Sequence, residues 1–419
     1  MSKSTHRVGV ALGEALTPVG EFLFETDGKR QTSLFRYARE WLDRADSFPL
    51  APNLPLAEMR FHQSGSRLNQ RSALPGPVSD GAPDAWGRGL IRKAQPGRLT
   101  ELDYLLAVDD ASRQGALRYL DEEGQPLART YPPVPRLNEL DDLRRMVAAA
   151  EGVELDSGLR DRLLGSAGSL GGGRPKASIR EGQGALAVAK FTTAQDAMPI
   201  ERMEVATLAL ARDAGLSAAS ARLELARTAR PVAVIQRFDR TASGERIHYL
   251  SAQSFIGVTS GEEAYYTDIA DMLRAHAVDV KAELGELYRR ILFTILVSNN
   301  DDHLKNHGLL HRGGGRWSLS PAFDINPQPH RHRHLETGIS ELSGNAASIE
   351  AALEAAPFFE VGADDAASTL ARMIGSIAER WRGHCRAAGM TGAEIKRYES
   401  AFDHEETRVA RRLVREFGI

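Results

Sequence analysis

The stretch Asn299-Asn300-Asp301-Asp302-His303-Leu304-Lys305-Asn306 decides the fold that this chain can form. It places a carboxylate, Asp301, five positions before an amide, Asn306, in a polar segment. Leucines and isoleucines at helical spacing within 284–296 predict a buried helix that delivers the chain to this stretch. A second acid, Asp324, follows downstream. The pattern therefore predicts a loop rich in oxygen ligands at the end of an apolar helix.

Two acids and an amide in this order suit phosphoryl transfer from ATP. That reaction needs one carboxylate to orient the attacking hydroxyl, and an amide with a further carboxylate to hold magnesium on the phosphates. The Asp-x-x-x-x-Asn spacing is that of a protein-kinase catalytic loop. We therefore predict Asp301 as the catalytic residue and Asn306 and Asp324 as Mg²⁺ ligands. His303 and Lys305 are near enough to help neutralise phosphate charge.

Other interpretations of the loop remain open. A helix cap is one, because Asn and Asp favour such positions. Asp302 competes with Asp301 for the catalytic role, but only Asp301 has the required spacing to the amide. His303 and His307 have the His-x-x-x-His spacing of a zinc protease, but Leu304 stands where that site needs a glutamate.

The segment Ser169-Leu170-Gly171-Gly172-Gly173-Arg174-Pro175-Lys176 contains consecutive glycines. Glycines let backbone N–H groups approach phosphate oxygens without obstruction by side chains. We predict Gly171, Gly172 and Gly173 as ATP-binding residues, although a flexible surface loop has the same composition. The segment is not a Walker loop, because Lys176 follows proline rather than glycine.

Further elements follow the glycines in the order that a kinase requires. Residues 176–180 and 185–192 predict a hairpin whose second strand carries Lys190 on its apolar face. A helix is predicted over 199–214 and a buried strand over 232–237. A lone strand lysine is usually exposed and idle, but this order favours Lys190 as a ligand of the α- and β-phosphates.

A strand-rich half followed by a helical half predicts an α+β, bilobal, protein-kinase-like fold. It would have an N-terminal α/β subdomain and an all-helical C-terminal lobe. Prolines in 131–135 break regular structure and mark a boundary. We predict an N-terminal subdomain over 1–130, a kinase N-lobe over 131–245 and a C-lobe over 246–419. Within the first part we expect short strands in 7–26, a helix over 33–46, a loop over 53–84 and a helix over 86–93.

Composition limits the class of protein. A chain of 419 residues exceeds one ordinary core, and 42% hydrophobic with 26% charged residues is typical of globular proteins. The net charge of −3 gives no global attraction to nucleic acid or an anionic membrane. The longest strongly apolar run, 291–297, is far below the ~20 residues that span a bilayer. With a single cysteine, Cys385, and no signal-peptide core, we expect a cytoplasmic protein without disulfides or a membrane partner.

Taken together, these motifs resemble the HipA family of serine/threonine kinases, the toxin half of bacterial toxin–antitoxin modules. The resemblance covers most of the chain. The matching stretches are Ser79–Arg88, Arg113–Tyr119, Ser169–Ala177, Leu186–Phe191, Val234–Arg240, Asn299–Asn306 and Ser320–Pro327.

The resemblance implies a phosphatidylinositol-kinase-like bilobal fold that uses ATP and Mg²⁺. It gives Asp301, Asn306, Asp324 and Lys190 the roles predicted above. Five further residues match positions around the nucleotide. These are Lys176 and His303, which match positions that approach it, Gln236 and Phe238 at the adenine hinge, and Asp239 near the ribose.

The family also implies regulation and partners. Ser169 matches an autophosphorylated serine in the glycine-rich loop. Family members phosphorylate an aminoacyl-tRNA synthetase and are inhibited by a dimeric helix-turn-helix antitoxin, which implies a HipB-like partner and contact with DNA only through it. The alternative function is a catalytically quiet scaffold that holds such an antitoxin on DNA. The tract Pro329–His334 matches no motif and leaves the substrate open, since it could bind metal, dock an acidic surface or form a solvated loop.

Overall fold

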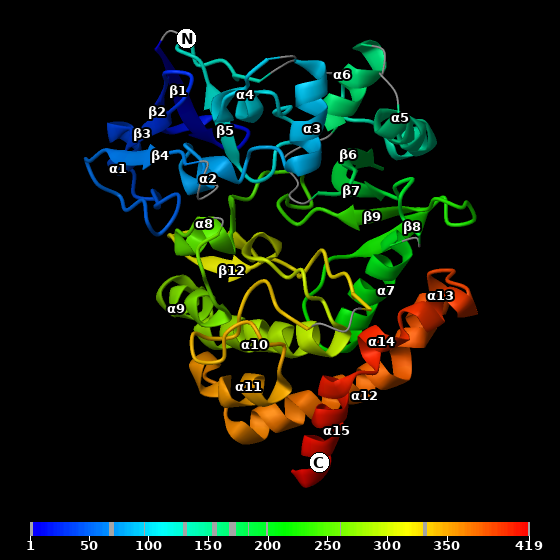
Figure 1. Cartoon of the computed structure of the whole chain (residues 1–419). Helices are drawn as coiled ribbons and strands as arrows, with labels where there is room; N and C mark the ends of the chain where they lie inside the picture. Colours follow the sequence, from blue (N-terminus) through cyan, green and yellow to red (C-terminus); the bar gives the residue numbers. More distant parts are fainter. Residues whose placement is uncertain are drawn as a thin grey trace. The chain divides into compact units, whose positions relative to one another are not determined.

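The structure described here is a computed structural model of the whole chain (Figure 1). The residues that it describes are 3–66, 71–95, 97–128, 132–152, 157–166, 173–182, 184–197, 200–259, 261–329 and 333–417.

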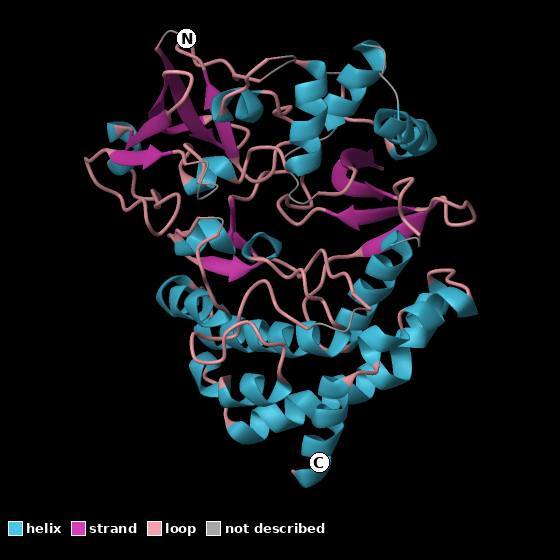
Figure 2. Ribbon diagram, in the orientation of Figure 1, coloured by secondary structure: helices cyan, strands magenta, loops and turns pink. Residues whose placement is uncertain are grey.

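The chain divides into two compact units, and each is built from segments that are distant in sequence. The first unit comprises 1–194, 236–262 and 309–316. The second comprises 195–235, 263–308 and 317–419. The predicted three-part division of the chain, at 130 and 245, stays a prediction. Figure 2 shows that strands are concentrated in the first unit and that helices dominate the second.

The first unit begins with a five-stranded sheet of order β4-β3-β2-β1-β5, in which every described pairing is antiparallel. Alternate side chains of β2 and β3, among them Phe22, Phe24 and Phe35, point into one core and are fully buried. Each such ring contributes roughly 1.5–3 kcal/mol by leaving water. The strands are β1 Ser4–Leu12, β2 Thr17–Thr26, β3 Gln31–Tyr37, β4 Phe61–Ser64 and β5 Leu117–Leu120.

The helix predicted over 33–46 is wrong. Residues 31–37 form strand β3, and only Arg39–Leu42 form a short helix, α1. Leu34 and Tyr37 have helical spacing to Trp41, but alternation in β3 buries Tyr37 beside Phe35, where pairing with β2 overrides the helical pattern. The loop predicted over 53–84 likewise contains strand β4 and the short helix α2.

The first unit also contains an antiparallel hairpin formed by β6 Lys176–Glu181 and β7 Ala185–Phe191. The predicted hairpin is therefore confirmed. The helix predicted over 86–93 is also confirmed. The other elements of this unit are α2 Gly76–Ser79, α3 Ala85–Ala94, α4 Glu101–Leu106, η1 Leu137–Glu139, α5 Leu140–Gly152, α6 Ser157–Ser166, β10 Tyr249–Ser251 and α8 Ala252–Ile256.

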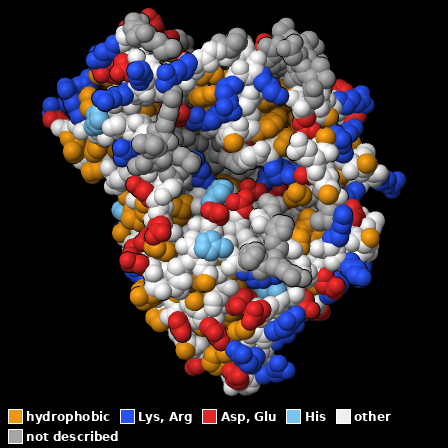
Figure 3. Space-filling model, viewed as in Figure 1, with side chains coloured by type: hydrophobic (Ala, Val, Ile, Leu, Met, Phe, Trp, Pro, Cys, Tyr) orange, Lys and Arg blue, Asp and Glu red, His pale blue; other side chains and the backbone are white. Residues whose placement is uncertain are grey.

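The second unit is mainly helical. The long helix α12 packs against α7 and α15, while α10 packs against α9. Figure 3 shows basic and acidic side chains intermingled over the C-terminal helices, as the small net charge leads one to expect. The elements are α7 Ile200–Asp213, β8 Ala221–Glu224, β9 Val232–Gln236, α9 Tyr266–His276, α10 Val280–Val297, η2 Leu304–Asn306, β12 Trp317–Leu319, α11 Ile349–Glu354, η3 Ala356–Phe359, α12 Ala363–Ala387, α13 Gly392–Arg397, α14 Glu399–Phe402 and α15 Glu405–Glu416. Strand β11, Gly308–His311, belongs to the first unit apart from Gly308, and β9 belongs to the second apart from Gln236.

Across the part of the chain that the structure describes, no helix combines the length and hydropathy needed to cross a bilayer.

Buried histidines make the stability of both units depend on pH. Burial lowers the pKa of His248, whose Nε2 lies 2.9 Å from the carbonyl oxygen of Leu50, to about 4. Burial also lowers the pKa of His404, whose Nε2 lies 3.2 Å from the carbonyl oxygen of Leu296, to about 4. An unfolded histidine protonates near pH 6.5, so below that pH the unfolded chain binds more protons than the folded one.

We therefore expect the free energy of unfolding to fall as the pH drops from 6.5 towards 4. The loss should reach about 2 kcal/mol per histidine at pH 5. Denaturant titrations across this range measure it. His248→Gln should give a shallower pH profile than the wild type, whereas His6→Gln, at an exposed position, should not. Parallel profiles for all three proteins would contradict the assignment.

Candidate active site

Helix α10 ends at a backbone conformation that turns the chain into the polar loop. Asp279 begins the helix, because its Oδ1 accepts a hydrogen bond from Ala282 N at 3.0 Å. Ser298 ends it in the left-handed conformation, with φ 57° and ψ 44°. Asn299 N still donates to Thr294 O at 3.0 Å, so the loop starts from a fixed backbone position.

Two adjacent acids in this loop have opposite environments. Asp302 is buried, and its Oδ2 accepts hydrogen bonds from the hydroxyl groups of Tyr266 and of Thr294, the latter at 3.1 Å. His307 Nε2 lies 3.3 Å from the same oxygen. Burial alone would raise the pKa of Asp302, but the charge of His307 and these hydrogen bonds outweigh it and lower it. Asp301, by contrast, is exposed.

Asn306 is held against the same loop. The short turn η2 closes with a hydrogen bond from Asn306 N to His303 O at 2.8 Å. Asn306 Nδ2 then donates to the backbone carbonyl oxygen of Asp301 at 3.1 Å. This bond uses the amide NH₂, which leaves the amide oxygen as the atom suited to a cation. The predicted pair of Asp301 and Asn306 is therefore brought together by the structure.

Asp324 is brought to this loop by two asparagines. Asn326 N donates to Asn299 Oδ1 at 2.9 Å, and Asn326 Nδ2 donates to Asp324 Oδ1 at 2.8 Å. Asp324 itself has a left-handed backbone, with φ 56°, which few residues other than Gly, Asn and Asp adopt readily. The asparagines were not predicted from the sequence, although Asn326 stands only two positions after Asp324.

Charge links the two predicted acids. Partial burial raises the pKa of Asp301 above its usual value, and the charge of His303 opposes that shift. The negative charges of Asp324 and Glu336 add to it. Two carboxylates that repel each other in this way gain from a bound cation.

The side chains fit magnesium in their chemistry. Mg²⁺ prefers oxygen donors, and Asp324 with the amide oxygen of Asn306 provides them. Asn326 Oδ1, beside Asp324, is buried and accepts no hydrogen bond from any described residue. Among the same residues, no cluster of three His, Cys, Asp or Glu side chains is arranged to hold a metal.

The two predicted lysines lie opposite each other in the first unit. Lys176 of β6 pairs in register with Lys190 of β7, and both side chains are buried. Lys176 Nζ lies 3.4 Å from Asp84 Oδ2, and Asp84 Oδ1 caps helix α3 by accepting from Gly87 N at 2.6 Å. Burial raises the pKa of Asp84, and the charge of Lys176 partly opposes this.

The predicted adenine and ribose positions follow at the end of β9. Gln236 is exposed, and the ring of Phe238 lies 6.2 Å from that of Tyr249. Asp239 is buried between the guanidinium groups of Arg237 and Arg240. Sequence reasoning assigned no role to these arginines, although both belong to the quoted motif.

Several predicted residues lie outside the described part of the chain. These are Ser169, Gly171, Gly172 and the tract residues 330–332. Gly173 is described, and a side chain there would meet open space. Arg333, at the end of the tract, donates to Ser298 Oγ and, at 2.7 Å, to Ser400 O.

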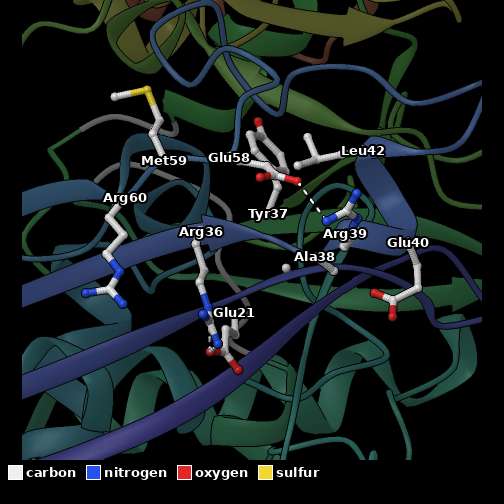
Figure 4. Close-up of a pocket in the computed structure, with 11 residues that line it drawn as sticks. Glu21, Arg36, Tyr37, Ala38, Arg39, Glu40, Leu42, Glu58, Met59 and Arg60 are labelled. Atoms are coloured by element: carbon white, nitrogen blue, oxygen red, sulfur yellow. Dashed lines mark hydrogen bonds and ion pairs between the residues drawn. The ribbon is translucent and has the colours of Figure 1, made fainter.

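A separate hollow lies on the N-terminal sheet (Figure 4). Its volume is about 540 Å³, and Figure 4 shows the guanidinium group of Arg39 directed towards Glu58. None of its lining residues belongs to the kinase-like motifs. They are Gly20, Glu21, Arg36 to Glu40, Leu42 and Glu58 to Arg60.

Comparison with known families identifies both halves of the chain. The HipA-like C-terminal domain matches residues 168–381, and the HipA N-terminal domain matches residues 10–120. The chain belongs to the HipA family. Its fold agrees with this: the HipA of the Shewanella oneidensis complex of HipA, HipB and operator DNA superposes with a TM-score of 0.66. That match covers 98% of both chains at 14% identity. The predicted α+β, kinase-like fold is confirmed, although the region predicted as an all-helical C-terminal lobe also contains strands β10, β11 and β12.

Curated relatives share more sequence identity with this chain, over shorter matches. The candidate kinase Y4mE of Sinorhizobium fredii is 25% identical over 339 residues, 73% of this chain and 74% of that protein. A candidate kinase of Haemophilus influenzae is 28% identical over 108 residues, 23% of this chain. That second match spans only 32% of the length of the Haemophilus protein.

Because Asp302 is the buried anchor beside Asp301, we expect Asp302→Asn to lower phosphoryl transfer by ~10- to 100-fold through loss of loop geometry. Steady-state assays at 25 °C measure this. Asp279→Ala, at the other end of α10, serves as the control because it costs about 1 kcal/mol of stability without touching the loop. Equal rates for Asp302→Asn and the wild type would show that the anchor does not position Asp301.

Proposed function

We propose that this HipA-family protein is an ATP- and Mg²⁺-dependent serine/threonine protein kinase. The observation that carries the proposal is the constellation of Asp301, Asn306 and Asp324 on one anchored loop system. Each has the chemical type and order that phosphoryl transfer requires. A scaffold without activity has no need of the intact set of Asp301, Asn306 and Asp324.

In the proposed mechanism, Asp301 accepts a hydrogen bond from the substrate hydroxyl and takes its proton as the hydroxyl oxygen bonds to the γ-phosphorus of ATP. The bond between the γ-phosphorus and the β,γ-bridging oxygen breaks in the same step, and ADP leaves. The raised pKa of Asp301 makes it a better base than an ordinary aspartate. Asn306 and Asp324 would hold magnesium, which neutralises charge on the phosphates when bound. The phosphates are proposed to bind to Lys190, Lys176, Gly171, Gly172 and Gly173, with His303 nearby. The adenine is proposed to contact Gln236 and Phe238.

The biological role that we propose is that of a HipA-like toxin in the cytoplasm. The Shewanella protein is in complex with HipB and operator DNA, and membership of the same family supports a HipB-like antitoxin as partner here. DNA would be reached through that antitoxin, in keeping with the net charge of −3. The proposed substrate is a serine of a translation component such as an aminoacyl-tRNA synthetase.

We propose in addition that autophosphorylation of Ser169 silences the enzyme. A phosphate would add ~1.5–2 negative charges to a loop that binds ATP phosphates, and repulsion would displace the loop.

Asp301→Ala should reduce ATP turnover by at least ~100-fold, because the base is lost, and should relieve any growth arrest on expression. Radiolabel transfer from ATP into a cell lysate measures the activity and marks the substrate. Asp364→Asn, an exposed acid in the first turn of α12, is the control and should leave turnover unchanged. Full activity in Asp301→Ala would refute the assignment, and an unmodified wild type that binds no Mg-ATP would favour the scaffold.

Incubation with Mg-ATP should place phosphate on Ser169 and reduce turnover in step with its occupancy, because of the charge repulsion described above. Intact-protein mass spectrometry with parallel assays measures both quantities. Ser169→Ala should stay active throughout the incubation. Complete modification with undiminished turnover would contradict the regulatory role.

A further inference from the structure

A buried network of charges in the first unit centres on Arg237, which lies between the two residues proposed to meet adenine. The guanidinium of Arg237 forms a two-pronged pair with Asp239, with Nε 2.8 Å from Oδ1 and Nη2 2.6 Å from Oδ2. The two side chains are only 2% and 3% exposed. Such a bidentate pair fixes direction as well as distance.

The same guanidinium reaches two other parts of the unit. Nη1 donates to Ser112 O at 2.7 Å and Nη2 to Arg113 O at 3.2 Å, both in the loop that precedes β5. Nη1 also lies 3.3 Å from Ser178 Oγ on β6. In addition, Arg237 N donates to Leu186 O on β7 at 3.2 Å. One residue therefore joins the 112–115 loop, the lysine-bearing hairpin and its own segment.

Asp239 is committed to protein donors on both of its oxygens. Besides Arg237, its Oδ2 accepts from Arg240 Nη1 at 2.7 Å and from Gly115 N at 2.7 Å. Burial would raise its pKa, but the two guanidinium charges outweigh burial and hold the pKa well below its usual value. Oδ2 accepts three hydrogen bonds and Oδ1 accepts one, and the side chain is only 3% exposed, so burial and these donors leave little of the carboxylate open to a ribose hydroxyl.

A second interaction connects the N-terminal part of the chain to the lysine-bearing hairpin β6–β7. Lys176, at the start of β6, pairs with Asp84, which caps α3 in the N-terminal part of the chain. Arg240 adds hydrogen bonds to the carbonyl oxygens of Gly115 and Arg113, at 3.3 and 2.9 Å. Residues from the N-terminal 120 thus hold both the lysine hairpin and the segment 236–240.

We propose that Arg237 and Asp239 are positioning residues through which the N-terminal part of the chain shapes the nucleotide site, and that Asp239 does not contact ribose. The proposal rests on the proposed kinase function. The N-terminal part of the chain then contributes to ATP binding by positioning the segment 236–240. Loss of one member of the network leaves the other charges buried without a partner, so the segment that carries Gln236 and Phe238 would shift.

The test measures binding of ATP and of 2′-deoxy-ATP to the full chain by calorimetry. Arg237→Lys keeps the charge but loses the fork, and should weaken both nucleotides by the same factor, ~10-fold or more. Asp239→Asn should do the same. In kinetics the KM for ATP should rise more than kcat falls, which a purely structural defect would not produce.

The matched control is Arg202→Lys in the second unit. Arg202 is another buried guanidinium, with hydrogen bonds to Ala388 O at 2.7 Å and Ala226 O at 2.6 Å. The Arg202→Lys variant should lower the melting temperature about as much as Arg237→Lys does, while its affinity for ATP stays at the wild-type value. If Asp239→Asn does not fold, Arg240→Gln removes one donor of the network and should show a smaller loss for both nucleotides.

Two results would overturn the proposal. Arg237→Lys with wild-type affinity for ATP would show that the network does not shape the site. Asp239→Asn that weakens ATP but not 2′-deoxy-ATP would show direct contact with the ribose hydroxyl. Failure of the kinase proposal is distinguishable, because the wild-type protein itself would then bind neither nucleotide.

Discussion

The arrangement of the catalytic loop depends on one buried carboxylate. Buried Asp302 contacts the hydroxyl groups of Tyr266 and Thr294 and the imidazole of His307. The two hydroxyl groups connect the loop to helices α9 and α10. The preceding residue, Asp301, is exposed on the same loop. A free carboxylate in such an interior would be costly, and the three partners remove that cost. The reactivity proposed for Asp301 thus depends on the hydrogen bonds made by its neighbour, Asp302.

The first unit uses the same principle with charged partners. There a buried carboxylate, Asp239, is matched by Arg237 and Arg240, and backbone carbonyl oxygens take up the remaining donors. Charges buried in this manner make weak contributions to net stability but define a single geometry. In both units, the residues proposed to act on ligands stand next to residues that are wholly occupied with the protein.

Local patterns in the sequence were sufficient for part of this picture. The spacing of Asp301 and Asn306 predicted their proximity, because five residues of loop leave little freedom, and the turn after β6 predicted the hairpin. The helix over 33–46 failed because Leu34, Tyr37 and Trp41 have helical spacing while Phe35 and Tyr37 have the spacing of a strand, and long-range pairing with β2 decided between the two patterns. Roles that depend on distant partners were also out of reach. The sequence around Asp302 does not predict its hydrogen bond from Tyr266, and the sequence around Asp239 does not predict its hydrogen bond from Gly115 N.

The left-handed backbone at Asp324 has an evolutionary consequence. Glycine is the residue that adopts this conformation most freely, so a replacement of Asp324 by glycine would preserve the path of the chain while deleting a carboxylate. If Asp324 binds magnesium as proposed, the glycine variant would be folded but inactive. It would retain every surface outside this loop, including any that a protein partner binds.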